Sequence, residues 1–282
     1  MVATWFITGC SSGFGEIFVR QLRAAGQNVI ATGRNAETRL AHLEDTGASV
    51  LDLDVTAPAF AINETIRQAW GIYPGGIDVV VNNAGFIVSG AIEEVSQDDM
   101  ESSMKTNFHG PLNITRAVLP LMRARGTGTL MYISSQAAWH PDVSAGSYCA
   151  SKAALEAAVG CLAKELAAFG SGIRIIMPEP GYFRTKVFAN LNHVAAEVSD
   201  YAQFHAGVKE FVAQVVGNEP GDPEKAVARM IEMVDGTGMA AGRTVPLRVP
   251  LGTDGWGRIK GEAEDLVRIC EEWEGVAKST DI

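Results

Sequence analysis

A tyrosine and a lysine four residues apart, Tyr148 and Lys152, are the side chains of this sequence best suited to move a proton. They lie at the start of a strongly helical stretch, where residues at this spacing share one face. A free tyrosine has a pKa of about 10 and is a slow acid or base near neutral pH. A lysine cation beside it favours the phenolate, so we expect Lys152 to lower the pKa of Tyr148. Ser135 ends a predicted strand, and its hydroxyl could hold a substrate carbonyl oxygen. Together these residues predict proton transfer at the oxygen of a ketone or a secondary alcohol.

A glycine-rich turn, Thr-Gly-Cys-Ser-Ser-Gly-Phe-Gly at 8–15, follows the first apolar run. Glycine lets a backbone turn tightly and approach a pyrophosphate, and the next helix offers unpaired N–H groups and a favourable dipole. The spacing is G-x-x-x-G-x-G, which differs from the commoner dinucleotide fingerprint G-x-G-x-x-G. Its position after the first strand nevertheless predicts a dinucleotide site. The residues that we expect to contact the cofactor here are Gly9, Ser11, Gly13, Phe14 and Gly15.

Arg34 follows the second predicted strand and bears on the choice of cofactor. In dinucleotide-binding folds an acidic residue at this place accepts from the ribose 2′-hydroxyl, whereas an arginine accommodates a 2′-phosphate. The strand ends Ala-Thr-Gly-Arg without an acid. A guanidinium pairs well with phosphate, and the sequence therefore favours NADP(H) over NAD(H).

Two further segments belong to the predicted cofactor site. Asp54 and Val55 close the third strand, where Asp54 could accept from the adenine amine, cap the next helix, or do both. Asn83, Ala84 and Gly85 follow the fourth strand. Their small size would let the backbone approach the cofactor, while the asparagine side chain ties neighbouring strands or turns together.

Short apolar runs alternate with helical patterns along the first two thirds of the chain. This alternation predicts an α/β fold, a Rossmann-like doubly wound parallel sheet with helices on both faces. Continuous apolar strands fit such a sheet because both of its faces are buried. Long helical stretches are expected near 98–125 and 146–169. The predicted strands are 2–8, 28–32, 49–53, 77–81, 129–134 and 173–177.

We expect residues 1–282 to form a single dinucleotide-binding oxidoreductase domain, since no repeat, low-complexity stretch or linker divides them. The segment 182–222 lacks a clear strand and holds many aromatic residues, so it is expected to be a substrate loop inserted over the site. Residues 250–282 are expected to form a C-terminal extension. Its amphipathic helix has one stripe of Ile259, Ala263, Leu266, Cys270 and Trp273.

The amino-acid composition excludes some classes of binding partner. Hydrophobic residues are 47% of the chain, and the net charge of −10 argues against nucleic acid or an anionic membrane as the main partner. The four cysteines form no C-x-x-C pair, so neither a zinc site nor a disulfide framework is expected. No apolar run reaches the ~18 residues of a membrane span, and no cleavable leader is evident. We expect a soluble, cytoplasmic protein without a metal.

The order of these motifs resembles the short-chain dehydrogenase/reductase family, of the non-extended type, over about residues 3–190. The resemblance implies that Asn107 is a fourth catalytic residue, holding a water in a proton relay beyond Lys152. By itself Asn107 reads as a helix-interior asparagine bonded to the backbone. Lys152 would also bond the nicotinamide ribose beside Tyr148. The family pattern further implies a nicotinamide-end contact from Pro180, Gly181, Phe183 and Thr185.

Weaker features refine the resemblance. Residues 249–254 and the helix after them are similar to a hydroxysteroid-dehydrogenase-like branch, which does not assign a steroid substrate. Ala138 stands where the family often has glycine, and Glu179 is an acid close to the expected nicotinamide, facing either toward it or away. Relatives commonly pair through the helix that corresponds to 149–168, which implies a homodimer or homotetramer.

Aromatic residues in the loops after the fourth, fifth and sixth strands suggest the substrate. Each alone is more often core packing, but together they converge where open α/β sheets bind ligands. We predict an NADP(H)-dependent oxidoreductase that interconverts a ketone and a secondary alcohol, with a medium-sized apolar or aromatic substrate. The alternatives are a non-catalytic NADP-binding regulator and a sugar-nucleotide epimerase or dehydratase. The aromatic residues are Phe86, Trp139, Tyr182, Phe188, Tyr201 and Phe204.

Overall fold

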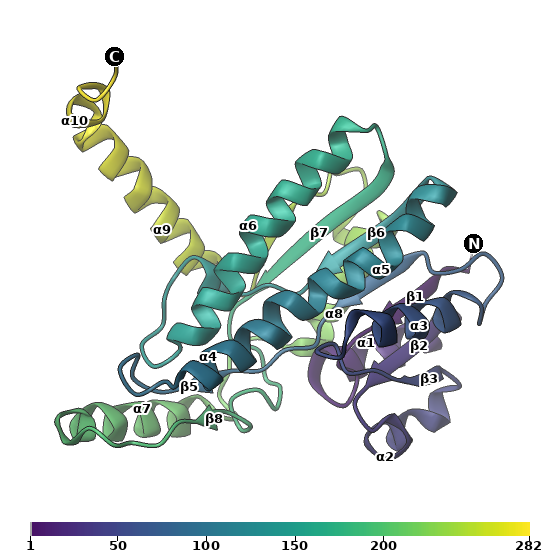
Figure 1. Cartoon of the computed structure of the whole chain (residues 1–282), viewed down its shortest axis with the longest axis horizontal. Helices are drawn as coiled ribbons and strands as arrows, with labels where there is room; N and C mark the ends of the chain where they lie inside the picture. Colours follow the sequence, from purple (N-terminus) through teal and green to yellow (C-terminus); the bar gives the residue numbers. More distant parts are fainter. Residues whose placement is uncertain (1) are drawn as a thin grey trace.

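The computed structural model describes residues 2–282, and its centre is a seven-stranded sheet (Figure 1). The strand order is β3-β2-β1-β4-β6-β7-β9, and every neighbouring pair is parallel. The chain winds outward in both directions from β1 and β4, so the predicted doubly wound parallel sheet is confirmed. The strands are β1 (Thr4–Ile7), β2 (Asn28–Gly33), β3 (Ser49–Asp52), β4 (Val79–Asn82), β6 (Thr127–Tyr132), β7 (Gly172–Pro180) and β9 (Arg248–Leu251).

Both faces of the sheet are covered because side chains of a strand point alternately to opposite sides. In β1, Trp5 and Ile7 enter the core on one face, whereas Phe6 enters the core on the other. The first face is packed by α1 (Gly13–Ala24) and α8 (Pro223–Asp235). The second is packed by α3 (Ala59–Trp70), α5 (Gly110–Arg125) and α6 (Gly146–Ala168).

The helical stretch predicted at 98–125 is divided in the structure. It comprises α4 (Gln97–Met104), a π-helical turn (Lys105–His109) and α5. Single π-helical turns inside α-helices often occur at functional sites. Between β2 and β3 the chain forms only the short α2 (Ala36–Arg39) and a 3₁₀ turn (Ala41–Thr46).

The seventh strand, β9, is absent from the sequence prediction. It contains Pro250 and lies at the edge of the sheet, where it pairs with β7 alone. Proline cannot donate to a ladder and is tolerated in edge strands, which explains why this segment does not look like a strand of the central sheet.

The segment 182–222 is more ordered than a loop. It contains β8 (Asn192–His193), a 3₁₀ turn (Ser199–Tyr201) and α7 (Ala202–Val215). β8 pairs in parallel with β5 (Val88–Ser89) to form a separate two-stranded sheet. This pairing holds the segment against the residues that follow β4.

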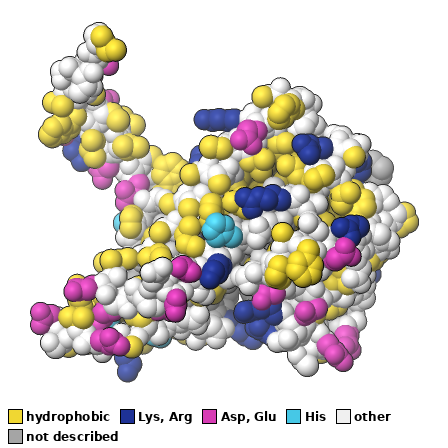
Figure 2. Space-filling view, in the orientation of Figure 1, with side chains coloured by type: hydrophobic (Ala, Val, Ile, Leu, Met, Phe, Trp, Pro, Cys, Tyr) yellow, Lys and Arg dark blue, Asp and Glu magenta, His cyan; other side chains and the backbone are white. Residues whose placement is uncertain are grey.

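The C-terminal arm, residues 253–278, consists of α9 (Thr253–Glu272) and α10 (Glu274–Lys278) and projects from the body (Figure 1). Only Gly255 and Ile259 of α9 are buried, so most of the predicted apolar stripe is exposed. Figure 2 shows hydrophobic side chains along this arm. None of the helices in residues 2–282 has both the length and the apolarity that crossing a membrane requires. The exposed apolar residues of the arm are Trp256, Leu266, Val267, Ile269, Trp273 and Val276.

Candidate active site

A connected cavity of about 1310 Å³ lies at the carboxyl ends of the central strands and brings together most of the predicted site. Gly15 and Asn107 do not line it and lie behind its wall. The predicted residues that line the cavity are Gly9, Ser11, Gly13, Phe14, Arg34, Asp54, Val55, Asn83, Ala84, Gly85, Ser135, Tyr148, Lys152, Pro180, Gly181, Phe183 and Thr185.

The glycine turn between β1 and α1 has the geometry of a phosphate cradle. Gly9 and Gly13 have φ angles of 72° and 59°, in the left-handed region that favours glycine. A side chain on Gly9 would approach the Cα of Ala84 to 2.8 Å, and one on Gly15 would collide with the carbonyl oxygen of Gly9. The side chain of Ser12 does not cap α1, which leaves N–H groups of its first turn free for an anion. The cradle therefore fits the pyrophosphate of a dinucleotide.

Replacing Gly15 with alanine should weaken NADPH binding at least tenfold and lower Tm, because forcing one carbon into a packed site costs about 1–3 kcal/mol. The turn must shift away from Gly9, although Gly15 itself does not line the cavity. Isothermal titration with NADPH and thermal denaturation would measure the two effects. Gly261→Ala in α9 is the matched control, since nothing lies within 4 Å of the added carbon. Parental affinity in Gly15→Ala would contradict the packing role.

Two exposed arginines, Arg34 and Arg39, line the end of the cavity beside β2. Neither forms an ion pair with another residue of 2–282. The nearby carboxylate of Asp52 accepts from the backbone N–H of Ala36 at 2.9 Å, at the start of α2. Two cations without a carboxylate partner suit a 2′-phosphate. Arg39 is missing from the sequence prediction, although its position five residues after Arg34, in the same basic segment, was a usable signal.

Asp54 and Asn83 support the cradle from the neighbouring strands. Asp54 accepts from the N–H and the hydroxyl of Thr56, at 2.8 and 2.7 Å, and does not cap α3, which begins only at Ala59. Its contact with adenine remains a prediction. The side-chain amide of Asn83 donates to the carbonyl oxygens of Thr8 and Gly9, at 2.9 and 3.0 Å. Asn83 thus ties β4 to the glycine turn, as the sequence predicts.

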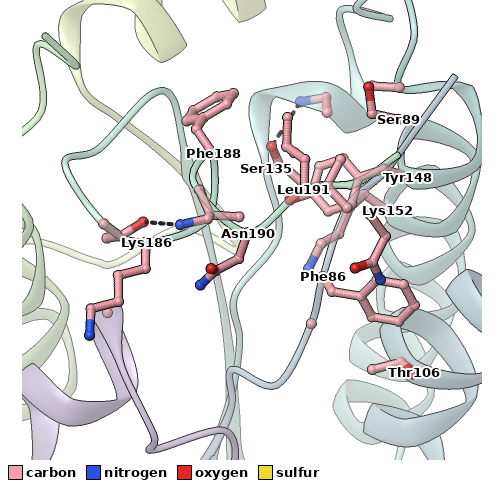
Figure 3. Close-up of a pocket in the computed structure, with 18 of the residues that line it drawn as sticks. Phe86, Ser89, Thr106, Ser135, Tyr148, Lys152, Lys186, Phe188, Asn190 and Leu191 are labelled. Carbon is pink, nitrogen blue, oxygen red and sulfur yellow. Dashed lines mark hydrogen bonds between the residues drawn. The ribbon is translucent and has the colours of Figure 1, made fainter. Parts of the chain in front are cut away.

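Ser135, Tyr148 and Lys152 meet where α6 begins beside the end of β6. Figure 3 shows the three on one side of the cavity and Lys186 and Phe188 on the other. The ammonium of Lys152 donates to the carbonyl oxygen of Ile133 at 2.7 Å and lies 5.7 Å from the centre of the Tyr148 ring. Lys152 is buried, and desolvation lowers its pKa to about 8, while the charge of Glu156 opposes this shift.

Despite the nearby Lys152, the pKa of Tyr148 is raised overall in this structure. Burial raises the pKa of Tyr148 to about 12, and a hydrogen bond with Ser135 offsets only part of the rise. Desolvation of the phenolate outweighs the attraction of a lysine that is itself buried and bonded to Ile133. At neutral pH Tyr148 is therefore a neutral phenol, the form that donates a proton.

Asn107 lies in the π-helical turn and is fully buried. Its side-chain oxygen accepts from the N–H of Phe86 at 3.1 Å, and its amide donates to the carbonyl oxygen of Phe86 and the hydroxyl of Ser151, both at 3.0 Å. These bonds fix the segment after β4 against the helix that carries Lys152. The backbone bonding expected from the sequence is thus observed, and the proton relay stays a prediction.

An apolar wall lines part of the cavity. One face of α7 lines it through Phe204, Val208, Phe211 and Val212. We call these four residues the α7 face. Four other lining residues are Phe86, Tyr182, Phe188 and Leu191.

Two of the predicted pocket aromatics lie elsewhere. The indole of Trp139 donates to Glu179 at 2.9 Å, and the hydroxyl of Tyr201 donates to Glu93 at 2.9 Å. Glu179 is buried and bonded to Trp139, so it is not free to face the nicotinamide.

Known proteins match both the sequence and this geometry. A family model described as short chain dehydrogenase matches residues 3–196. The oxidoreductase claN of Passalora fulva is 37% identical over 190 residues, which cover 66% of this chain and 84% of claN. A short-chain dehydrogenase from Streptomyces avermitilis is similar at 35% identity and a TM-score of 0.86, covering 100% of both chains.

A serine dehydrogenase solved in complex with NADP⁺ is similar at 29% identity and a TM-score of 0.69, covering 87% of this chain and 94% of that one. These matches agree with the glycine cradle and with the grouping of Ser135, Tyr148 and Lys152 in one cavity. The chain therefore belongs to the short-chain dehydrogenase/reductase family of oxidoreductases.

Proposed function

We propose that this chain is an NADP(H)-dependent oxidoreductase that interconverts an apolar ketone and its secondary alcohol, with reduction as its main direction. The observation that carries the proposal is the position of Tyr148. Its neutral phenol lies, with Ser135 and Lys152, in one cavity with both the dinucleotide cradle and the apolar α7 face.

The cofactor would be held by the glycine turn at its pyrophosphate and by Arg34 and Arg39 at a 2′-phosphate. NADPH, when bound, supplies the hydride for the reduction. The phosphorylated cofactor is mostly reduced in cells, which favours ketone reduction over alcohol oxidation. A nicotinamide cofactor is consistent with the NADP⁺ in the similar serine dehydrogenase.

The proton step follows from the three polar groups. The hydroxyl of Ser135 holds the carbonyl oxygen of the substrate, and the phenol of Tyr148 gives its proton to that oxygen as the alcohol forms. The Lys152 ammonium stabilises the phenolate left behind, because an opposite charge favours the ionised form. Asn107 keeps α6 and the segment after β4 in register for this step.

The substrate class follows from the walls around Tyr148. The α7 face, Phe86 and Phe188 offer no hydrogen-bonding side-chain group, so affinity for substrate along this wall should come from burial of apolar surface. A medium-sized apolar or aromatic ketone fits such a wall better than a small polar sugar.

The test is NADPH oxidation with a panel of steroid, aromatic, aliphatic and sugar ketones. We expect turnover of apolar ketones, and Phe211→Ser should raise their KM about tenfold, since a lost apolar contact costs on the order of 1–3 kcal/mol. Ala213→Ser is the matched control, because Ala213 lies on α7 but does not line the cavity.

Other outcomes would favour the rival functions. Tight NADPH binding without reduction of any ketone would favour a regulator. Conversion of a sugar nucleotide with no net change in NADPH would favour an epimerase or dehydratase.

A further inference from the structure

Two buried carboxyl groups, Glu156 of α6 and Glu179 of β7, lie together behind the active site. Their exposed fractions are 5% and 1%, and both carboxyl groups lie against the guanidinium of Arg248. Carboxylates are seldom buried unless they are paired or protonated, since desolvation penalises their charge. The proton-transfer step described above uses neither of them.

Glu156 is connected to the active site through consecutive residues of one strand end. Lys152 donates to the carbonyl oxygen of Ile133 at 2.7 Å, and the next residue, Ser134, donates its hydroxyl to Glu156 at 2.5 Å. The residue after that is Ser135. One turn of α6 therefore bonds to the backbone of Ile133 and the side chain of Ser134, the two residues before Ser135. Glu156 lies one helical turn after Lys152.

Among the residues that the structure describes, Arg248 is the only lysine or arginine within ion-pair distance of either carboxyl group. Arg248 of β9 donates to Glu156 at 2.9 Å and lies 3.7 Å from the nearer oxygen of Glu179. Trp139, in the segment after β6, donates its neutral indole N–H to that same oxygen of Glu179. Two ionised carboxylates would have to share this one guanidinium as a direct partner, and an interior charge with so weak a partner is unfavourable.

The other charged neighbours form no ion pair with Glu179 among the described residues. His140 follows Trp139 but is directed to Glu262 of α9, at 2.7 Å. Burial and the charge of Glu156 raise the pKa of Glu179 well above its ordinary value. Burial lowers the pKa of Lys152, and the charge of Glu156 offsets part of this lowering.

We propose that Glu156 and Glu179 share one proton and act as positioning residues for the reaction. The Glu156 carboxylate keeps Lys152 in its cationic form. Protonated Glu179 holds the side chains of Glu156 and Trp139 in place. The catalytic part of this inference rests on the function proposed above. The proton sharing itself depends only on the buried cluster.

Two amide variants separate the roles. In Glu156→Gln the charge beside Lys152 is lost, and the titration midpoint of the ammonium should fall by about one pH unit, as expected for loss of a nearby opposite charge. In Glu179→Gln the amide can still donate to Glu156 and accept from Trp139, so that midpoint should stay within about 0.3 unit of the parent.

The midpoint can be followed without turnover by ¹⁵N NMR of lysine-labelled protein, with the signal assigned by its loss in Lys152→Met. An infrared spectrum at neutral pH should contain the carbonyl band of a protonated carboxylic acid, and Glu179→Gln should remove it. An unchanged midpoint in Glu156→Gln, or a shift in Glu179→Gln as large as in Glu156→Gln, would overturn the positioning role. Absence of the infrared band from the parent would overturn the proton sharing.

The same one-unit shift should appear in the upper limb of the pH profile of kcat/KM for ketone reduction by Glu156→Gln. A shifted NMR midpoint in a protein that reduces no ketone would support the carboxyl pair and contradict the proposed function. A merely structural role for Glu156 would lower Tm and leave both midpoints where they are.

Discussion

Tyr148→Phe is expected to lower kcat for ketone reduction by about 10²–10⁴, the usual contribution of a positioned general acid. The change removes one oxygen atom and leaves the aromatic ring in place, so the first turn of α6 should keep its packing. The cradle is built from other residues, and NADPH affinity should change by less than about threefold, within the range of a single weak contact. Stopped-flow or steady-state oxidation of NADPH, together with a binding titration, measures both quantities.

A matched substitution shows whether the loss is specific to Tyr148. Tyr73→Phe also removes a phenol oxygen, one that bonds to Ser49 at 3.0 Å away from the cavity, and its kcat should equal that of the parent. If Tyr148→Phe retained more than a tenth of the parental kcat, another group would have to donate the proton.

The double variant Arg34→Ala/Arg39→Ala is expected to weaken NADPH binding by about 10²-fold or more, while NADH binding changes little. A hydrogen bond to a charged group contributes about 1.5–3 kcal/mol, and each arginine can supply such bonds to a 2′-phosphate. Titration of the parent and the variant with both cofactors gives the selectivity ratio directly, and the effect should shrink as salt is added.

The control for this selectivity is Arg116→Ala, which removes an exposed arginine of α5 that bonds to Asn113 outside the cavity. It should leave both affinities unchanged. Equal losses for NADPH and NADH in the double variant would show that the arginines support the fold of this corner and do not select the phosphate.

Local patterns in the sequence were sufficient for the central sheet. The six strands predicted from apolar runs are all present, because parallel strands buried on both faces have mostly apolar sequences. β9 escaped prediction because a strand at the edge tolerates Pro250, which elsewhere signals a break. α7 escaped too, although Phe204, Val208 and Phe211 recur at helical spacing, because none of its residues is buried in a core that would mark the helix.

The gathering of the predicted site residues in one cavity was predictable to a similar degree. Gly9, Gly13 and Tyr148 belong to short motifs whose members are close in sequence, and the cavity contains them all. The carboxyl pair was not predictable. Glu156, Glu179 and Arg248 come from three elements distant in the chain, and each alone has the pattern of an ordinary charged residue.

The pairing of β5 with β8 determines how rigid the wall above Tyr148 can be. Only two residues of each strand pair, and the backbone N–H groups of Asn192 and Val194 supply its bonds to Ile87 and Ser89, each at 3.0 Å. A ladder this short contributes little to global unfolding and belongs to the least protected class of structure. We expect the wall formed by α7 to open through local fluctuations while the seven-stranded sheet stays intact. Substrate exchange and global stability can therefore be altered independently by mutation.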